Sequence, residues 1–463
     1  MKYQSPQSMR RRRIANPPST PQNRARVELL NRTARVYTLP TEILGLIFEA
    51  CFFESTYASQ QCAFTLSRTT KYFRQVALCT PLLWGNIEHM TSFTGLSRIA
   101  TCLRRSKNKP LRIVLRIGDD NRVEDIDRVL DSINPHIHRW QELHIIGSFQ
   151  YRIPVWINRL AKVEAPNLET LLIAGGGFRD AIVLEESKLF NSGAPRLVSV
   201  KLRNVLPQQC LPPLTHVRRL QIECADRFSD AFPVLNGLSH LTHLSIINSC
   251  SDNSLTSAIH LPALLALGIS ARTNSQLFPE FLGALIAPSL ESLSLIGVNT
   301  KHLDRLLAGT DLSGTPNFPA LRSLTIGSVD NNISVEHWDQ LTMLFPHITD
   351  FTLIDMGEAM AQCNNLGLGE SGLLHWKHLN TFTLRGDPGT GKGAVMHITL
   401  ALLQLLLLRK KMGYPVRDLR ISKPISDAIE SIGRMAHLDS TVDRYQICPV
   451  NLSGYGLVKA MFW

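Results

Sequence analysis

The sequence predicts an α/β protein in which a small helical domain precedes an irregular solenoid of strand–helix repeats, with a parallel concave sheet and outer helices. Three observations support this prediction. Residues 37–90 carry apolar residues at helical spacing. A six-residue phrase with apolar residues at its first, fourth and sixth positions then recurs through residues 107–442. The segments between its copies often have a helical pattern.

The first 36 residues differ from the rest of the chain. They hold nine basic residues and one acidic residue, and so account for +8 of the net charge of +11. With few apolar residues, this segment is predicted to be a disordered basic tail. Arg10 to Arg13 form either a nuclear-localisation patch or a solvated tail. Because the remaining 427 residues are nearly balanced, we expect no broad attraction to nucleic acid.

The domain at residues 37–90 is centred on the stretch from Leu39 to Trp84. Pro40 suits the first turn of a helix, where its missing N–H would have no partner. One apolar helix face is then predicted from the spacing of Ile43, Leu44, Ile47, Phe48 and Cys51. A second helix is expected over roughly Gln60 to Ala77, followed by the apolar plug Leu82 to Trp84. Since about 45 residues cannot bury this much apolar surface, the excess is expected to face another protein.

These residues resemble an F-box, of the F-box-like type abundant in basidiomycete fungi. The resemblance rests on Leu39-Pro40-x-Glu42-Ile43-Leu44-x-x-Ile47-Phe48, Leu66-Ser67-Arg68, Tyr72-Phe73, Val76-Ala77 and Thr80-Pro81-Leu82-Leu83-Trp84. It implies docking onto the Skp-type adaptor of a cullin–RING ubiquitin ligase. The adaptor-binding residues it implies are Leu39, Pro40, Ile43, Leu44, Ile47 and Trp84. Glu54 to Gln61 is polar where the family has a leucine-rich helix.

After a predicted connecting helix at residues 91–106, Pro110 to Ile117 alternates as a first strand. Eleven copies of the phrase follow, at intervals of 20 to 37 residues. The fourth positions of these copies are Leu143, Leu171, Val200, Leu220, Leu244, Leu267, Leu293, Leu324, Phe351, Phe382 and Leu419. The phrase resembles the leucine-rich repeat.

Stacked repeats of this kind imply a parallel sheet on a concave wall. In each strand, residues two apart share a face, so Leu293 and Leu295 are expected to point inward and Ser292, Ser294 and Ile296 outward. Residues 443–463 are predicted to be either a cap over the last repeat or an exposed tail.

Charged residues at outward strand positions are the candidate target-binding residues. They are Lys201, Arg203, Arg219, Glu223, His243, Asp350, Arg385 and Arg420. Arg pairs well with acidic or phosphorylated groups. The pattern therefore indicates such a partner, or equally a solvated sheet face.

Catalytic motifs are weak. Gly386 to Gly393 nearly matches a phosphate-binding P-loop through Lys392, but Gly393 stands where the metal-binding hydroxyl should be. Ala394 to Leu408 is too short to cross a membrane and is predicted to be a buried helix. His240 and His243, like His375 and His378, lack the further ligands that a zinc site needs. Nine scattered cysteines without a CxxC pair indicate a reducing compartment.

The sequence therefore predicts a binding protein without catalytic activity, cofactor or metal. The two resemblances together imply the substrate-recognition subunit of a Skp–cullin–F-box ubiquitin ligase, with an unknown protein target on the repeats. No membrane or nucleic-acid partner is expected, and the protein is placed in the cytoplasm or nucleus. The alternatives are an interaction scaffold that engages no ligase and, more remotely, a P-loop NTPase.

Overall fold

The fold is taken from a computed structural model and falls into two compact units. Unit 1 comprises Met1–Ile87 and Thr101–Lys109, and unit 2 comprises Glu88–Ala100 and Pro110–Trp463. The residues that the structure describes are 34–54, 59–89, 95–117, 123–147, 153–175, 189–205, 212–224, 232–248, 258–271, 277–297, 299–309, 318–327, 335–354, 376–385 and 392–448.

Unit 1 is helical. Its elements before the first strand are the 3₁₀ helix η1 (Arg35–Thr38), α2 (Thr41–Glu54), α3 (Ser59–Thr69), α4 (Lys71–Cys79) and the 3₁₀ helix η2 (Pro81–Trp84). The predicted first helix is therefore present. The predicted single helix from Gln60 to Ala77 is instead two helices, because Thr70 adopts an extended conformation and its hydroxyl accepts a hydrogen bond from the Phe73 N–H (3.1 Å). This N-cap starts α4 as a separate helix.

The core of unit 1 forms around η2. The Trp84 side chain is fully buried, and its indole N–H donates to the Ala77 carbonyl (2.7 Å). The Phe64 ring packs edge-on against it, with 5.3 Å between ring centroids. On α2, Leu44 and Phe48 are 1% and 3% exposed. Of the predicted apolar face of α2, Leu44 and Phe48 therefore enter this core, whereas Ile43 and Ile47 remain exposed.

Unit 2 is built on a parallel sheet. The strands of the 14-stranded sheet follow one another in chain order, with the short β8 (Ile259–His260) and β10 (Leu285–Ile286) paired separately. The strands are β1 (Asn86–His89), which contains the boundary between the units, β2 (Leu111–Ile117), β3 (Trp140–Gly147), β4 (Thr170–Ala174), β5 (Ser199–Arg203), β6 (Arg219–Cys224), β7 (His243–Asn248), β9 (Ala266–Ala271), β11 (Ser292–Ile296), β12 (Ser323–Gly327), β13 (Asp350–Ile354), β14 (Thr381–Arg385), β15 (Asp418–Ser422) and β16 (Arg444–Cys448).

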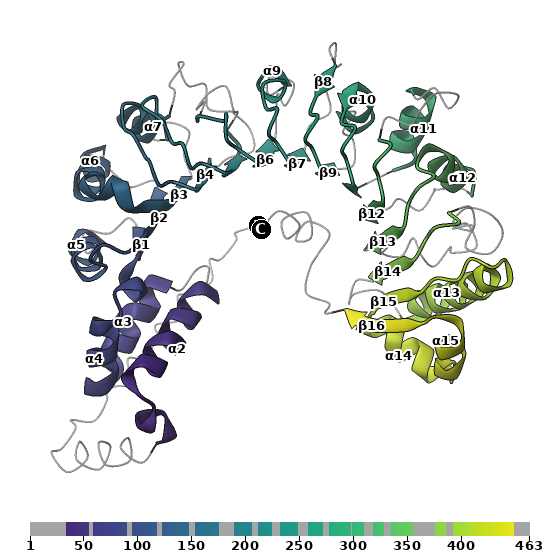
Figure 1. Cartoon of the computed structure of the whole chain (residues 1–463), viewed down its shortest axis with the longest axis horizontal. Coiled ribbons are helices and arrows are strands. Elements are labelled where there is room, and N and C mark those ends of the chain that lie inside the picture. The colour runs from purple at the N-terminus through teal and green to yellow at the C-terminus, as the bar shows by residue number, and fades with distance from the viewer. Residues whose placement is uncertain are drawn as a thin grey trace, which may run out of the picture. The chain divides into compact units, whose positions relative to one another are not determined.

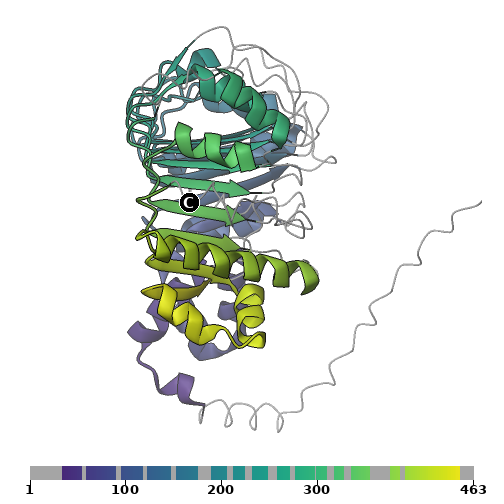
Figure 2. The same ribbon diagram turned by 90° about the vertical axis from the view of Figure 1, so that its right-hand side faces the viewer.

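The repeat phrases set the register of this sheet. Each of the eleven predicted strands is present, and the fourth positions of neighbouring phrases pair directly, as in Leu293 with Leu267 and Leu324. These residues are buried because they face the helices, which form an outer layer in unit 2 (Figure 1). The neighbouring strands from β2 to β16 pair in parallel, as the green strands in Figure 2 illustrate. The prediction of a mixed α/β, solenoid-like repeat fold with a parallel sheet and outer helices is confirmed.

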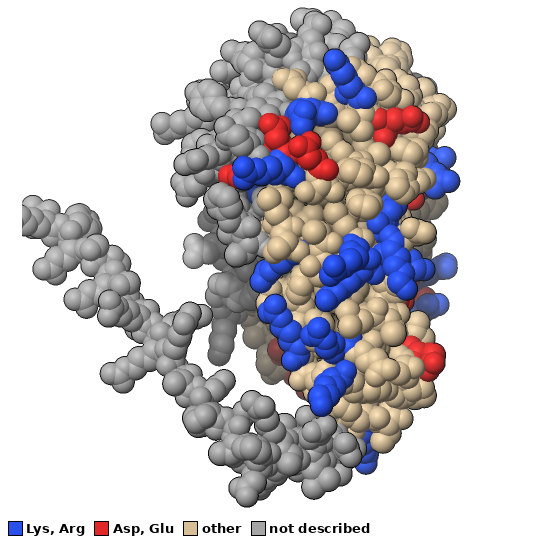
Figure 3. Space-filling model, turned by 90° about the vertical axis from the view of Figure 1, so that its left-hand side faces the viewer, with Lys and Arg blue, Asp and Glu red and all other residues tan. Residues whose placement is uncertain are grey.

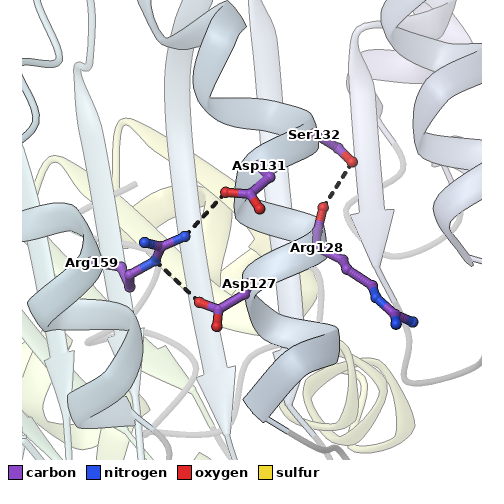
Figure 4. A network of polar contacts seen from close by, with 5 residues as sticks. All are labelled: Asp127, Arg128, Asp131, Ser132 and Arg159. Atoms are coloured by element: carbon purple, nitrogen blue, oxygen red, sulfur yellow. Dashed lines mark hydrogen bonds and ion pairs between the residues drawn. The ribbon is translucent and has the colours of Figure 1, made fainter.

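The helices around the sheet pack on one another as well as on the strands. They are α5 (Gly95–Arg105), which also contains a boundary between the units, α6 (Val123–Ile133), the 3₁₀ helix η3 (Asn134–Arg139), α7 (Ile153–Ala161), α9 (Phe232–Leu235), α10 (Leu277–Ala284), α11 (Thr300–Gly309), α12 (Val335–Leu344), α13 (Lys392–Lys411), α14 (Lys423–Ser431) and α15 (Met435–Thr441). Arg159 on α7 illustrates such a contact, since its guanidinium reaches Asp127 (3.1 Å) and Asp131 (3.0 Å) on α6 (Figure 4). These exposed pairs contribute little free energy, but they tie neighbouring repeats together.

The sheet extends past both ends of the predicted repeats. β1 has no copy of the phrase. β16 lies in the segment expected to form a cap or tail, yet it carries a twelfth copy, Val442-Asp-Arg-Tyr445-Gln-Ile447, which the sequence analysis did not count. Arg444 to Cys448 pair in register with Asp418 to Ser422 of β15. Tyr445 and Ile447 remain 40% and 42% exposed. β16 therefore ends the described part of the sheet as one more parallel strand, and its first four residues are exposed.

In the middle of the concave face, residues that were predicted to point outward are nevertheless buried. Ser294 and Ile296 are each only 1% exposed. Along one row of paired positions, Ile247, Ser270, Ile296, Gly327 and Ile354 alternate large and small. A Cβ on Gly327 would lie 2.6 Å from the Ile296 Cδ1 atom, so the glycine makes room for that side chain. Strands about 4.8 Å apart thus let each isoleucine cover its small neighbours and form a second apolar cluster.

The apolar run after residue 391 is α13, as predicted. Gly413 has φ +84° and its N–H donates to the Lys410 carbonyl (3.1 Å), which ends the helix. Arg409 is 1% exposed, and its guanidinium donates to the Trp376 carbonyl (2.9 Å). Burial lowers the pKa of Arg409 to about 10, so it is still charged at neutral pH. Within the described residues, no helix has the length and apolar character needed to span a membrane.

Candidate protein-binding surfaces

The exposed stripe of α2 is the first candidate surface. Ile43, Leu46 and Ile47 are 44%, 62% and 42% exposed, and Pro40 beside them is exposed too. We call Pro40, Ile43, Leu46 and Ile47 the α2 apolar face. Positions 43, 46 and 47 fall on one side of a helix because they are three and four residues apart. Exposed contiguous apolar surface of this kind marks interaction sites in soluble proteins.

The predicted adaptor-binding residues divide between this face and the core. Pro40, Ile43 and Ile47 are exposed, and Leu39 is half-buried, with its carbonyl accepting a hydrogen bond from the Tyr72 hydroxyl (2.6 Å). Leu44 and Trp84 are 1% and 0% exposed. These two side chains hold unit 1 together and present no surface to a partner. Leu46 is the residue that sequence reasoning missed, although its spacing from Ile43 was a usable signal.

Unit 1 also carries a basic surface that the sequence analysis did not identify. Arg105 lies over the Trp84 ring, with its guanidinium carbon 4.3 Å from the ring centroid. Its pKa is lowered by burial and by the positive charges of Arg74 and Arg104. Arg74 and Arg104 are both exposed, so the three arginines make this part of unit 1 basic. Figure 3 shows Lys and Arg side chains gathered on one face of the molecule.

The predicted target-binding residues fall into two groups on the strands of unit 2. The first group lies on β5 to β7, where Arg203 forms an ion pair with Glu223 (3.2 Å), its register partner. Arg219 pairs in register with His243, whose pKa is lowered by burial and by that arginine. Lys201 is half-buried on β5. The structure thus brings five of the eight predicted residues onto three neighbouring strands.

The second group lies on β13 to β15. Asp350 accepts a hydrogen bond from the Thr349 hydroxyl (2.7 Å). Arg385 is half-buried, and its Nε is enclosed without a hydrogen-bond partner, whereas Arg420 is exposed. Between the two groups lie the buried serines and isoleucines of the central concave face. The eight residues therefore do not form one continuous charged surface.

A further polar cluster on β1, β2 and β3 was not predicted. Arg112 pairs with Glu142 (2.5 Å), and Arg116 pairs with Glu88 (2.8 Å). His144 Nε2 lies 3.7 Å from Glu142 but is buried without a hydrogen bond. Burial, reinforced by the positive charges of Arg112, Lys201 and Arg116, lowers the pKa of His144 to about 4. His144 is therefore neutral at physiological pH, and its contact with Glu142 is not an ion pair.

This histidine predicts a pH dependence of stability. The unfolded chain binds a proton at His144 near pH 6.5, but the folded chain does so only near pH 4. Since the unfolded state then holds more protons, the free energy of unfolding falls as pH drops, by about 1 kcal/mol between pH ~7.5 and ~5.5. Burial raises the pKa of Glu142, which acts in the opposite direction at lower pH. Urea unfolding of wild type and His144→Gln over this window measures the effect, and equal pH slopes would contradict it.

The remaining predicted features supply no site in the described residues. Residues 386–391 of the P-loop-like segment, and His375, lie outside them, and Lys392 is the first residue of α13. In the part of the chain that the structure describes, no three His, Cys, Asp or Glu side chains are grouped to hold a metal ion.

The fold and surfaces define a class of protein, a mixed α/β repeat solenoid with a parallel sheet and a helical N-terminal unit. No protein-family model and no curated protein matches the chain. Among solved structures, it is similar to a structural-genomics protein from Bacteroides fragilis. That similarity has 14% sequence identity and a TM-score of 0.32, and covers 64% of this chain and 69% of the other. Similarity at this level carries no inference about function.

Proposed function

We propose that the protein is the substrate-recognition subunit of a Skp–cullin–F-box ubiquitin ligase. The observation that carries the proposal is the α2 apolar face, which leaves Ile43, Leu46 and Ile47 exposed within the F-box-like motif. A helix that presents side chains at i, i+3 and i+4 fits a hydrophobic groove on a partner. The Skp-type adaptor is the partner that the motif implies.

The repeats of unit 2 then serve as the target-binding part, in the manner of a leucine-rich-repeat domain. Their parallel sheet provides a long surface of strand positions whose side chains vary from repeat to repeat. In this proposal the chain performs no chemistry. It raises the effective concentration of a bound target near the ubiquitin-charged enzyme that the cullin recruits.

Co-purification of the full chain with a basidiomycete Skp-type adaptor and a cullin tests this proposal. We expect wild type to retain both proteins and Leu39→Ala/Pro40→Ala to lose them. Pro40 belongs to the α2 apolar face and Leu39 precedes it, so their truncation removes part of the proposed contact surface without removing the Leu44 and Phe48 core. If both proteins fail to bind wild type, the chain is a repeat-based interaction scaffold that engages no ligase, and the proposal is wrong.

A further inference from the structure

An open cavity of about 540 Å³ lies at the edge of unit 2 where β13, β14 and β15 begin. Four of its lining residues, Arg322, Thr349, Asn380 and Arg417, occupy the second position of four successive repeat phrases. The backbone N–H of Thr349, Asn380 and Arg417 donates in turn to the carbonyl of the preceding member, at 2.8, 2.8 and 2.9 Å. This ladder places the four residues side by side. The volume lies within the range of ligand-binding cavities.

The lining of this cavity is positively charged. Lys377 and His378, from the turn before β14, join Arg322 and Arg417, and among the described residues no Asp or Glu lines the cavity. The backbone ladder continues beyond the lining to Glu291 on the Arg322 side and Asp443 on the Arg417 side. Asp350 and Asp418, each next in the chain to a lining residue, have other polar partners. Asp350 accepts from the Thr349 hydroxyl, and Asp418 lies 3.9 Å from Arg444.

Several of these donors are available to a ligand. The Arg322 guanidinium is partly used, since it donates to the carbonyls of Pro319 (3.3 Å) and Leu321 (3.0 Å). The side chains of Lys377 and Arg417 form no hydrogen bond or ion pair with other residues in the described ranges, and both are exposed. The cavity therefore combines permanent positive charge with unused N–H donors.

We propose that this cavity, which we call the basic edge cavity, binds a phosphorylated side chain within an extended peptide segment of a partner protein. A phosphoryl group carries nearly two negative charges and three strong acceptor oxygens, which match converging arginine and lysine donors. The four repeats span three strand spacings of about 4.8 Å, or about 14 Å. That span accommodates about four extended residues, a phosphorylated residue with its immediate neighbours.

The lining favours a peptide over a nucleic acid. Proteins that bind single strands stack successive bases on aromatic side chains along a basic groove. Among the described lining residues, Tyr414 is the one Phe, Tyr or Trp side chain, and it is half-buried, so these residues offer no such series. The proposal concerns unit 2 and goes beyond the proposed ligase function. It holds whether or not the α2 apolar face binds an adaptor.

Fluorescence anisotropy with the full chain tests the proposal. The probe is a short fluorescein-labelled Gly/Ala peptide with one phosphoserine, and its unphosphorylated form is the reference. We expect the phosphopeptide to bind at least about tenfold more tightly than the reference. Lys377→Glu/Arg417→Glu should abolish this difference, and the uncharged Lys377→Gln/Arg417→Gln pair should reduce it.

Lys301→Glu/Arg305→Glu is the matched control, because both residues are exposed on α11 and the change in net charge is the same. We expect this control to retain phosphopeptide binding. Equal binding of both peptides, or an equal loss in the control and the cavity variants, would overturn the proposal. Displacement of the peptide by an equal concentration of inorganic phosphate would assign the cavity to the free anion instead. Tighter binding of a single-stranded oligonucleotide that depends on Lys377 and Arg417 would likewise overturn it.

Discussion

Ile43→Asp/Ile47→Asp is expected to lower adaptor affinity at least about 100-fold. These substitutions place two carboxylates in the centre of the α2 apolar face, which the proposed interface would remove from water. Burying unpaired charge costs several kcal/mol, and about 3 kcal/mol already corresponds to a 100-fold loss. Surface plasmon resonance with the immobilised adaptor measures the change.

Folding provides the control for this experiment. Both isoleucines are more than 40% exposed, so their replacement should alter stability by no more than about 0.5 kcal/mol. Met343→Asp is a matched variant, because Met343 on α12 is 69% exposed and belongs to unit 2. We expect Met343→Asp to bind the adaptor like wild type. Undiminished binding by the double aspartate variant would exclude the α2 apolar face as the docking surface.

The strands could be predicted from the sequence because each repeat carries two independent signals. Apolar residues at alternate positions fix the strand, and the first apolar residue of each phrase fixes its start. The pairing of Leu293 with Leu267 and Leu324 follows from that spacing alone. β16 was missed although its signal was present, because Val442-Asp-Arg-Tyr445-Gln-Ile447 has the same pattern, with tyrosine at the fourth position, and pairs in register with the phrase of β15.

The partition of α2 into a buried and an exposed stripe could not be predicted. Leu44 and Ile43 are adjacent and equally apolar, and only the packing of α4 and η2 determines which one is buried. Sequence periodicity identifies an apolar face but not its width. The exposure of Leu46 depends on the same packing.

Contacts between neighbouring repeats, as on the concave face and in the basic edge cavity, were also not predicted from the periodicity of single repeats. Ile296 was expected to point outward, away from the helices, but the sequence did not show that it would be buried there by covering Gly327 on the next strand. Arg322 and Arg417 are 95 residues apart in the sequence and meet through the stacking of β12 to β15. Comparing the second position of every phrase would have revealed this row.

Trp376→Ala is expected to cause the largest loss of stability in unit 2. The side chain is fully buried, and its ring centroid lies 5.0 Å from that of Phe351. Its indole N–H donates to the Phe345 carbonyl (2.8 Å), and its own carbonyl accepts from Arg409 (2.9 Å). Removing a buried tryptophan side chain costs about 3–5 kcal/mol.

The loss should be local, because each repeat of a solenoid is stabilised mainly by its neighbours. Hydrogen–deuterium exchange is therefore the suitable measurement. We expect exchange in β13 to β15 to accelerate roughly 10²- to 10³-fold, while β3 to β5 stay protected. Trp376→Phe should show a smaller effect, since it keeps the aromatic contact and loses only the hydrogen bond to Phe345.

Trp156→Ala on α7 provides the reciprocal comparison, because Trp156 is 1% exposed and belongs to a distant repeat. Its replacement should accelerate exchange in β3 and β4 and leave β13 to β15 unchanged. Trp376 also precedes Lys377 and His378 of the basic edge cavity, so Trp376→Ala should weaken phosphopeptide binding while adaptor binding by unit 1 persists. Uniform acceleration across all strands in either variant would mean that unit 2 unfolds as one cooperative block, contrary to the nearest-neighbour behaviour expected of stacked repeats.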